Sequence, residues 1–390
     1  MYWFGIESMN PETSAELPLL IYANAEQVSD LYYLTGLMAP DPYFAVRTGE
    51  ELIVAVSPLE YGRAIKCEKP TRVIDIQSLA EQSKPLMDAG YSAEGANIVV
   101  VLRECGIKFV CVTRDFPHYL AEELAQAKIM ISIYEGYLLK ERVIKSDSEV
   151  ENIRDAISTT EKCLARVEEI LGASVIENGM LRWQGEWLTS ERVQQEIELV
   201  CLTLSARVDH SIVAGGDQGC DPHEAGHGVL YANQLIIVDI FPRSKKHHYW
   251  GDLTRTFLKG KPTPEQIKLV DTVAEAQKLA IGKIADGVDS GSIHREVEQY
   301  FEQQGYATGM KDGVYQGFFH GTGHGFGLDI HEPPRLGKRQ GATLKAGMIV
   351  TVEPGLYYPG LGGCRIEDDV LVTSDGCEVL SNYRYDWIIT

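Results

Sequence analysis

Residues 318–336 read FFHGTGHGFGLDIHEPPRL, a glycine-rich stretch that contains His320, His324 and His331 within twelve residues. Glycine has no Cβ, so the backbone here can crowd closely around a site. A single histidine is most often a buried side chain with its hydrogen bonds satisfied, but three in so short a stretch favour a functional site. This stretch is therefore expected to contribute histidines to a functional site.

Two carboxylates lie in apolar runs on either side of this stretch. Asp239 lies in NQLIIVDIF, whose length and β-branched residues predict a buried strand, and Glu353 ends a similar run in GMIVTVEPGLYY. A buried carboxylate is costly unless a cation or hydrogen-bond donors compensate it. A buried ion pair or a helix cap would explain one such residue, but two in one domain favour a metal site.

Two further carboxylates complete a candidate cluster. Asp252, in HHYWGDLTRTF, follows Asp239 by thirteen residues, the separation of a hairpin that would bring both side chains together. Glu367, in GCRIEDDVLVT, is expected on a strand with Asp369 on the same face. The five candidate ligands are Asp239, Asp252, His324, Glu353 and Glu367.

Four carboxylates do not converge without cations. Oxygen ligands with one nitrogen suit Mn²⁺, Co²⁺, Fe²⁺ or Zn²⁺, with manganese preferred here. If two carboxylates bridge, the set fits two divalent ions about 3.5–4 Å apart, the spacing that activates a water for hydrolysis.

Hydrophobic patterning divides the chain into two parts. The first third carries five runs expected as strands (LPLLIYA, YFAVRTG, ELIVAVS, ANIVVVL and IKFVCVT) and one helix, AEELAQAKIMI, which together predict an α/β domain. A long amphipathic helix is then expected from Ser146 or Ser148 to Gly172. Helices at about 190–206, 263–285 and 291–304, separated by isolated strands, predict an α+β domain.

In this order and in these contexts, the five residues resemble the Xaa-Pro peptidase family with the pita-bread fold, metallopeptidase family M24, which includes proline dipeptidase and aminopeptidase P. The resemblance covers the whole chain, since YLTGL through SPLEYGRA resembles the family's creatinase-type N-terminal domain and RVIKSDSEVENIRDA resembles the start of its catalytic domain. It implies an α/β creatinase-like domain at 1–141 and an α+β pita-bread catalytic domain at 142–390. One departure is the Asp239–Asp252 separation, thirteen residues where the family has eleven; the extra residues are expected at the hairpin tip.

The resemblance also implies a role for each ligand. Asp239 would chelate the first metal, Asp252 and Glu367 would bridge the two metals, and His324 with Glu353 would complete the second. Glu353 would also shuttle the proton of a hydroxide that bridges the metals.

Four more residues take roles from the resemblance. His331 would contact the substrate, either stabilising the oxyanion or holding the proline residue. His223 would lie over the site without binding metal and would hydrogen-bond the substrate or the leaving amine. Both are therefore expected to be catalytic, as is Glu353. Arg335 would hold the carboxylate of a dipeptide, the alternative being a solvated loop arginine. Arg365 would orient the bridging carboxylates rather than touch substrate.

His223 begins HEAGH (223–227), which spells the H-E-x-x-H signature of zinc proteases. That signature requires a helix, because only there do both histidines face one zinc. Gly226 inside the motif and Gly228 after it favour a loop. The zinc-protease hypothesis is therefore rejected, and His227 is assigned no metal-binding or catalytic role.

The expected activity is hydrolysis of the Xaa-Pro bond of dipeptides. Arg335 and the fourteen-residue spacing between Glu353 and Glu367 favour a dipeptidase. The general similarity of the N-terminal domains keeps an Xaa-Pro aminopeptidase open as the alternative. A metal-free creatinase-type hydrolase and a non-catalytic binding scaffold are disfavoured because all five ligands are present.

Composition narrows the choice of partners. The 390 residues include 44% hydrophobic and 24% charged residues, typical of a globular protein, and the net charge of −20 disfavours nucleic acid and anionic membranes. The N-terminus shows no signal-peptide pattern and no run reaches bilayer length, so a cytoplasmic protein is expected. The eight scattered cysteines are expected to be free thiols. The resemblance implies a homodimer, with loops around GLMAPDPYF limiting substrate length in the partner's site.

Overall fold

The computed structural model describes residues 17–49, 51–134, 139–338 and 341–390. The chain divides into two compact units, Met1–Lys140 and Glu141–Thr390, so the division lies one residue before the expected boundary. We refer to them as the N-terminal unit and the catalytic unit. None of the described helices has the length and apolar character needed to span a bilayer.

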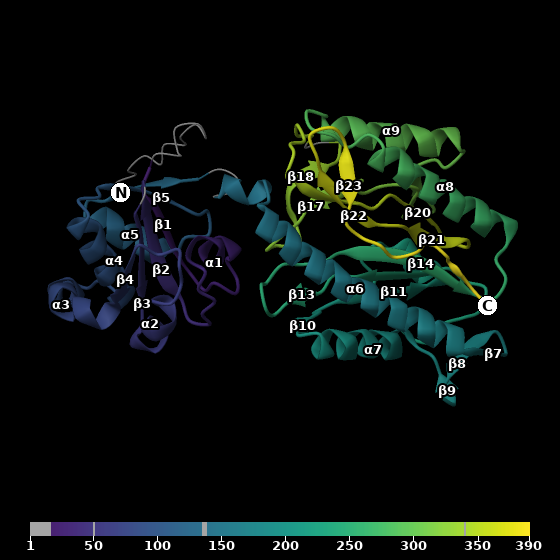
Figure 1. The fold of residues 1–390 in the computed structure, drawn as a ribbon, viewed down its shortest axis with the longest axis horizontal. Helices are drawn as coiled ribbons and strands as arrows, with labels where there is room; N and C mark the ends of the chain where they lie inside the picture. The colour runs from purple at the N-terminus through teal and green to yellow at the C-terminus, as the bar shows by residue number, and fades with distance from the viewer. Residues whose placement is uncertain (1–16, 50, 135–138, 339–340) are drawn as a thin grey trace. The chain divides into compact units, whose positions relative to one another are not determined.

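The N-terminal unit is a mixed sheet with helices on both faces (Figure 1). Its strand order is β4-β3-β2-β1-β5-β6, in which β1, β2 and β3 are antiparallel neighbours and β4, β5 and β6 join in parallel. Residues alternate between two cores: Leu20 and Phe44 pack with α4 and α5, whereas Leu19 and Tyr43 pack with α1 and α2. The elements are β1 Leu19–Ala23, α1 Ser29–Thr35, β2 Tyr43–Thr48, β3 Glu51–Val56, α2 Pro58–Ala64, β4 Arg72–Asp75, α3 Ala80–Asp88, α4 Ala93–Glu104, β5 Phe109–Val112, α5 His118–Gln126 and β6 Met130–Ile133.

Four of the five runs expected here as strands are confirmed as β1, β2, β3 and β5. The prediction for ANIVVVL was wrong, because the run forms α4, whose N-cap Ser92 accepts a hydrogen bond from the Gly95 N–H at 3.0 Å. A continuous apolar run has the same pattern in a buried helix as in a buried strand. The expected helix at 121–131 is confirmed only to Gln126, since β6 follows it.

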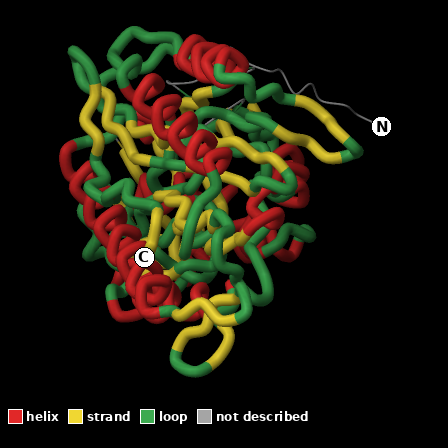
Figure 2. The backbone as a smooth tube through the Cα atoms, turned by 90° about the vertical axis from the view of Figure 1, so that its right-hand side faces the viewer, coloured by secondary structure: helices red, strands yellow, loops and turns green. Residues whose placement is uncertain are grey.

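The catalytic unit surrounds its strands with long helices (Figure 2). Its larger sheets have the orders β11-β12-β14-β24 and β18-β17-β19-β22-β23. Helices α6 and α7 pack together, as do α8 and α9, and α6 contacts β12 and β14 while α8 contacts β19 and β21. The helices are α6 Asp147–Ala173, α7 Ser190–Thr203, α8 Pro264–Ile281 and α9 Ser290–Gln303.

The strands of the catalytic unit are short. They are β7 Val175–Glu177, β8 Met180–Trp183, β9 Glu186–Trp187, β10 Ala206–Arg207, β11 Ser211–Gly215, β12 Ile236–Ile240, β13 Arg243–Ser244, β14 Leu253–Lys259, β15 Gly309–Lys311, β16 Val314–Gln316, β17 Gly323–Gly325, β18 Glu332–Leu336, β19 Ile349–Val352, β20 Gly355–Tyr358, β21 Gly362–Arg365, β22 Asp368–Val372, β23 Cys377–Val379 and β24 Ile388–Ile389.

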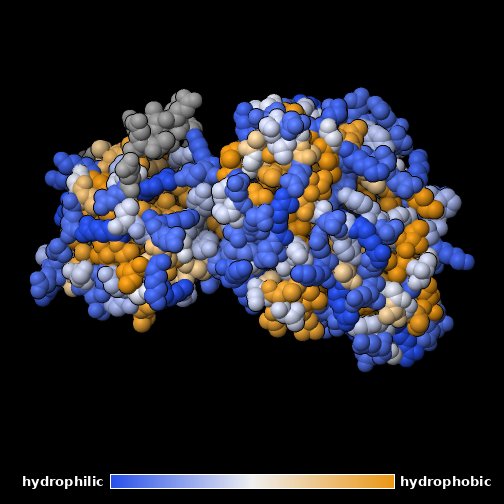
Figure 3. Space-filling model, viewed as in Figure 1, coloured by the Kyte–Doolittle hydropathy of each residue, from blue (hydrophilic) through white to orange (hydrophobic). Residues whose placement is uncertain are grey.

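Helix α6 confirms the expected long helix. Ser146 is its N-cap, and the Ser146 N–H donates to Glu149 Oε2 at 2.9 Å in a capping box. The helix ends at Ala173, one residue after the expected stop. Its apolar stripe is buried, and hydrophilic and apolar residues are interspersed on the visible face of the catalytic unit (Figure 3).

Candidate active site

Strands β12 and β14 place two of the candidate ligands side by side. Asp239 of β12 pairs with Thr254 of β14 in the antiparallel register. Asp252 precedes Thr254 by two residues, and side chains two apart in an extended chain share a face. The expected hairpin is therefore confirmed, and both carboxylates point to one side of the sheet and line the same cavity.

The other three candidate ligands lie in or next to strands of the second large sheet, β18-β17-β19-β22-β23. His324 is the middle residue of β17, Glu353 directly follows β19, and Glu367 directly precedes β22. The sheet is joined to the first one here, since the Glu367 N–H donates to the Thr254 carbonyl at 3.1 Å. The prediction that Glu367 lies on a strand was wrong by one residue, because β22 begins at Asp368.

All five candidate ligands line one cavity of about 1130 Å³. His324 Nε2 lies 3.7 Å from Asp252 Oδ2 and 3.5 Å from Glu353 Oε1. One donor atom each of Asp252, His324 and Glu367 lies within 4.8 Å of the others, a spacing that could hold a metal ion. The residues that the sequence singled out thus converge.

Burial and mutual repulsion perturb these side chains strongly. Burial, followed by the charge of Glu367, raises the pKa of Asp252 well above its usual range, and burial with the charge of Glu353 does the same for Glu367. Burial also raises the pKa of Glu353 to about 7 and lowers that of His324 to about 3. Carboxylates held this close are ionised together only when cations neutralise them.

The donor set fits divalent cations. Asp239 lines the cavity, and its Oδ1 is buried without a hydrogen-bond partner among the described residues, so this oxygen is available to a cation. The carboxylates with one neutral imidazole form the oxygen-rich set that Mn²⁺, Co²⁺, Fe²⁺ and Zn²⁺ accept.

Neighbouring side chains hold the ligands in place. Arg365 Nη2 donates to Asp239 Oδ2 at 2.6 Å and Nη1 donates to Tyr357 Oη at 2.9 Å. Arg365 thus contacts the carboxylate expected on the first metal, and not the bridging pair. The Thr254 hydroxyl donates to Glu367 Oε2 at 2.7 Å. Sequence reasoning gave Thr254 and Tyr357 no role, although both lie inside the motifs GDLTRTF and VEPGLYY.

His320, noted in the sequence without a role, also joins this support. Its Nε2 lies 2.8 Å from Tyr357 Oη, and its Nδ1 lies 2.7 Å from the Gly321 carbonyl. Burial lowers its pKa to about 3, so the ring is neutral. His320 therefore belongs to the wall of the cavity, outside the candidate ligand set.

The three residues expected to meet substrate, His223, His331 and Arg335, also line the cavity. The rings of His331 and His324 make an edge contact with centroids 4.4 Å apart. Burial, then the charge of Arg335, lowers the pKa of His331. Arg335 lies on β18, is half-buried and lines the same cavity, so its contact with substrate stays a prediction.

The HEAGH stretch forms no helix in the structure. Gly226 has φ 88°, and a Cβ there would lie 1.9 Å from the Val213 carbonyl oxygen. His227 is exposed and lies 3.4 Å from Glu224. The expected loop is confirmed, and the geometry that a zinc protease needs is absent from these residues.

Comparisons with known proteins agree with this geometry. The model of metallopeptidase family M24 matches residues 151–374. An uncharacterised peptidase of Staphylococcus haemolyticus is 33% identical over 62% of this chain and 63% of its own, so the chain spans just under two thirds of such relatives. The Xaa-Pro dipeptidase of Pyrococcus horikoshii is 28% identical over 92% of both chains.

Solved structures extend the similarity to both units. A prolidase from Pyrococcus horikoshii OT3 has a TM-score of 0.76 at 25% identity and covers 97% of both chains. An X-Pro aminopeptidase from Thermotoga maritima has a TM-score of 0.79 at 21% identity, over 97% of this chain and 99% of its own. Fold and site thus define a metallopeptidase with a creatinase-like N-terminal domain and a pita-bread catalytic domain. The chain belongs to metallopeptidase family M24.

Proposed function

We propose that this protein is a dinuclear metal-dependent Xaa-Pro dipeptidase. The convergence of Asp239, Asp252, His324, Glu353 and Glu367 on one cavity carries the proposal. A relative described as an Xaa-Pro dipeptidase, aligned over 92% of this chain, supports the choice of substrate.

The five side chains would hold two divalent ions, Asp239 at the first, His324 and Glu353 at the second, and Asp252 and Glu367 between them. Such ions lower the pKa of a water and polarise the scissile carbonyl. Arg365 keeps Asp239 in place through their 2.6 Å contact, and Thr254 does the same for Glu367.

The remaining steps belong to side chains. Glu353 takes a proton from the attacking water at a carboxylate oxygen and returns it to the nitrogen of the leaving proline. His331, beside His324, donates a hydrogen bond to the developing oxyanion. His223 contacts the substrate from the loop that borders the cavity.

Arg335 would bind the carboxylate of the dipeptide through a bidentate pair. Turnover of Leu-Pro and of Leu-Pro-Gly by the wild type and by Arg335→Met tests this assignment. A dipeptidase cleaves Leu-Pro faster, and Arg335→Met should raise its KM. Preference for the tripeptide would instead assign an Xaa-Pro aminopeptidase.

The ligand assignment has a separate test. Glu367→Ala and Asp252→Ala should lower the metal content measured by elemental analysis. His223→Ala should lower kcat with the metal content unchanged, because His223 is not a ligand. Loss of metal from His223→Ala, or full metal in both carboxylate variants, would contradict the assignment.

A further inference from the structure

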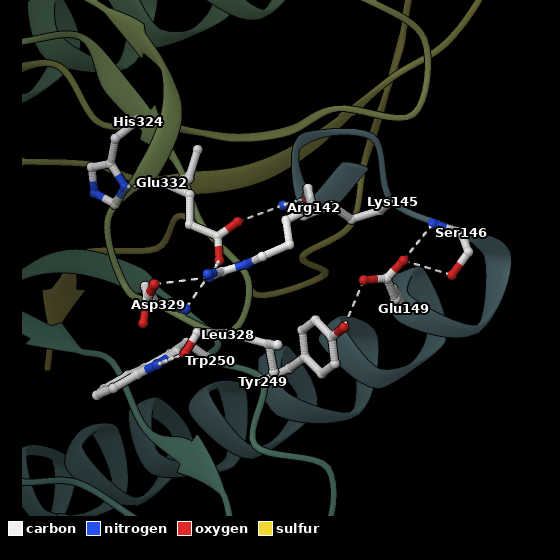
Figure 4. Close-up of polar contacts among 11 residues, drawn as sticks. Arg142, Lys145, Ser146, Glu149, Tyr249, Trp250, His324, Leu328, Asp329 and Glu332 are labelled. Atoms are coloured by element: carbon white, nitrogen blue, oxygen red, sulfur yellow. Dashed lines mark hydrogen bonds and ion pairs between the residues drawn. The ribbon is translucent and has the colours of Figure 1, made fainter. Parts of the chain in front are cut away.

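Two buried cations meet a buried carboxylate beside the active site (Figure 4). Lys145 Nζ lies 2.8 Å from Glu332 Oε2, and Arg142 Nη2 contacts Glu332 Oε1. The side chains of Arg142, Lys145 and Glu332 are 3%, 1% and 1% exposed. Arg142 Nη2 also lies 2.9 Å from Asp329 Oδ2. We call these four residues the Glu332 cluster.

The cluster joins segments that are distant in the sequence. Arg142 and Lys145 lie just before α6, Asp329 lies between β17 and β18, and Glu332 is the first residue of β18. Buried charges are costly unless well paired. Burial raises the pKa of Glu332, but the charges of Lys145 and Arg142 outweigh it, so the net pKa is lowered and the carboxylate is ionised.

The segment that Glu332 holds leads directly to His331. Residues 326–331 connect β17 to β18, and Glu332 Oε1 accepts the Asp329 N–H at 3.0 Å within this turn. Gly327 packs on the cluster so closely that a Cβ would lie 3.1 Å from both Glu332 carboxylate oxygens. The position of the Glu332 carboxylate therefore sets the path of the backbone up to His331.

Trp250 holds the 326–331 segment through two further hydrogen bonds. Its backbone N–H donates to the Gly327 carbonyl at 2.9 Å, and its indole Nε1 donates to the Leu328 carbonyl at 3.0 Å (Figure 4). Trp250 stands two residues before Asp252. The segment is thus held between the residues that lead into β14, which include the candidate ligand Asp252, and the Glu332 cluster.

We propose that Arg142 and Lys145 are positioning residues for His331, acting through Glu332 and the 326–331 segment. The inference rests on the proposed function, in which His331 touches substrate. Small displacements of a substrate-contacting group lower turnover strongly. The cluster therefore contributes to turnover as well as to stability.

A mutant cycle on the full chain separates these two contributions. Lys145→Met and Glu332→Gln are each made with His331 intact and in His331→Ala, and kcat and KM for Leu-Pro, metal content and melting temperature are measured. With His331 intact, kcat/KM should fall by about tenfold or more, whereas in His331→Ala it should fall less than about twofold. Metal content should stay unchanged. An equal fall in both backgrounds would overturn the proposal, because a merely structural role predicts it.

Two further variants keep the test decisive. If Glu332→Gln does not fold, Asp329→Asn, whose side chain is 40% exposed, loosens Arg142 more mildly and should show the same dependence on His331. Arg154→Met breaks an exposed pair of α6 with Glu378 and should leave turnover unchanged.

Hydrogen exchange separates this inference from the proposed function. Lys145→Met should speed amide exchange in 326–331 and leave β19 unchanged, whatever the enzyme cleaves. Amide exchange in 326–331 as slow in Lys145→Met as in the wild type would overturn the positioning role. A wild type that cleaves no proline peptide, with the exchange result intact, would instead contradict the proposed function.

Discussion

Replacing Arg365 by methionine should destabilise the catalytic unit strongly. The guanidinium is 4% exposed and lies 2.6 Å from Asp239 Oδ2. It also donates to the hydroxyls of Tyr357 at 2.9 Å and Thr254 at 3.3 Å. Methionine retains most of the length of the side chain but none of these donors.

The size of the effect follows from what Arg365→Met leaves behind. Asp239 Oδ1 already has no hydrogen-bond partner within the part of the chain that the structure describes, so the variant removes the partner of the other carboxylate oxygen. Breaking a buried ion pair by removing one member costs about 3–5 kcal/mol. With a urea dependence of about 2.5 kcal/mol per molar, the unfolding midpoint should fall by about 1.2–2 M.

Urea unfolding of the chelator-treated protein, followed by tryptophan fluorescence, measures this loss. Four of the five tryptophans lie in the catalytic unit, so the signal reports mainly on that unit. Lys278→Met is the control, because its pair with Glu275 is 68% and 58% exposed and screened by solvent, so the midpoint should hardly move. Equal midpoint shifts for Arg365→Met and Lys278→Met would refute the reasoning.

Three further predictions concern packing, metal and pH. Gly363→Ala should cost about 1–3 kcal/mol, because its Cβ would lie 1.9 Å from the Gly219 carbonyl oxygen, whereas Gly376→Ala meets no atom within 4 Å; equal melting temperatures would contradict this. Chelation should abolish peptidase activity, and metal at a hundredfold excess over Kd should restore about 2.7 kcal/mol of stability; an unchanged melting temperature on chelation would argue against the site. The pKa of Glu332 is lower in the folded protein than its ordinary value of 4.5, so the ionised carboxylate stabilises the fold above pH 4.5. This contribution is lost as the pH falls through the pKa of Glu332 in the folded protein, and the urea midpoints of Glu332→Gln and the wild type should converge below that pH. A constant difference down to pH 3 would exclude the ion pair as its source.

Local pattern predicted most of the elements, and its errors have a physical cause. Short β-rich runs predicted β1, β2, β3 and β5, and Ser146 is one of the two serines expected to cap α6. ANIVVVL was assigned to a strand because every position from Ile98 to Leu102 is apolar. Those residues are buried because α4 packs in the core shared with the sheet. A helix enclosed in this way loses the periodicity that identifies a surface helix.

The sequence by itself determined which residues could form the site. Asp239 and Glu353 were identified because a carboxylate in a buried apolar run is costly without a cation or donors. HEAGH was rejected as a zinc-protease motif because its glycines favour a loop. These inferences depend on composition and spacing, which the chain carries before it folds. Only the tertiary structure decided that Arg365 pairs with Asp239 and that Arg142 and Lys145 meet Glu332. These partners are separated by more than a hundred residues, and their pairing depends on how the sheets and α6 pack, because charge–charge contacts across such distances leave no local pattern.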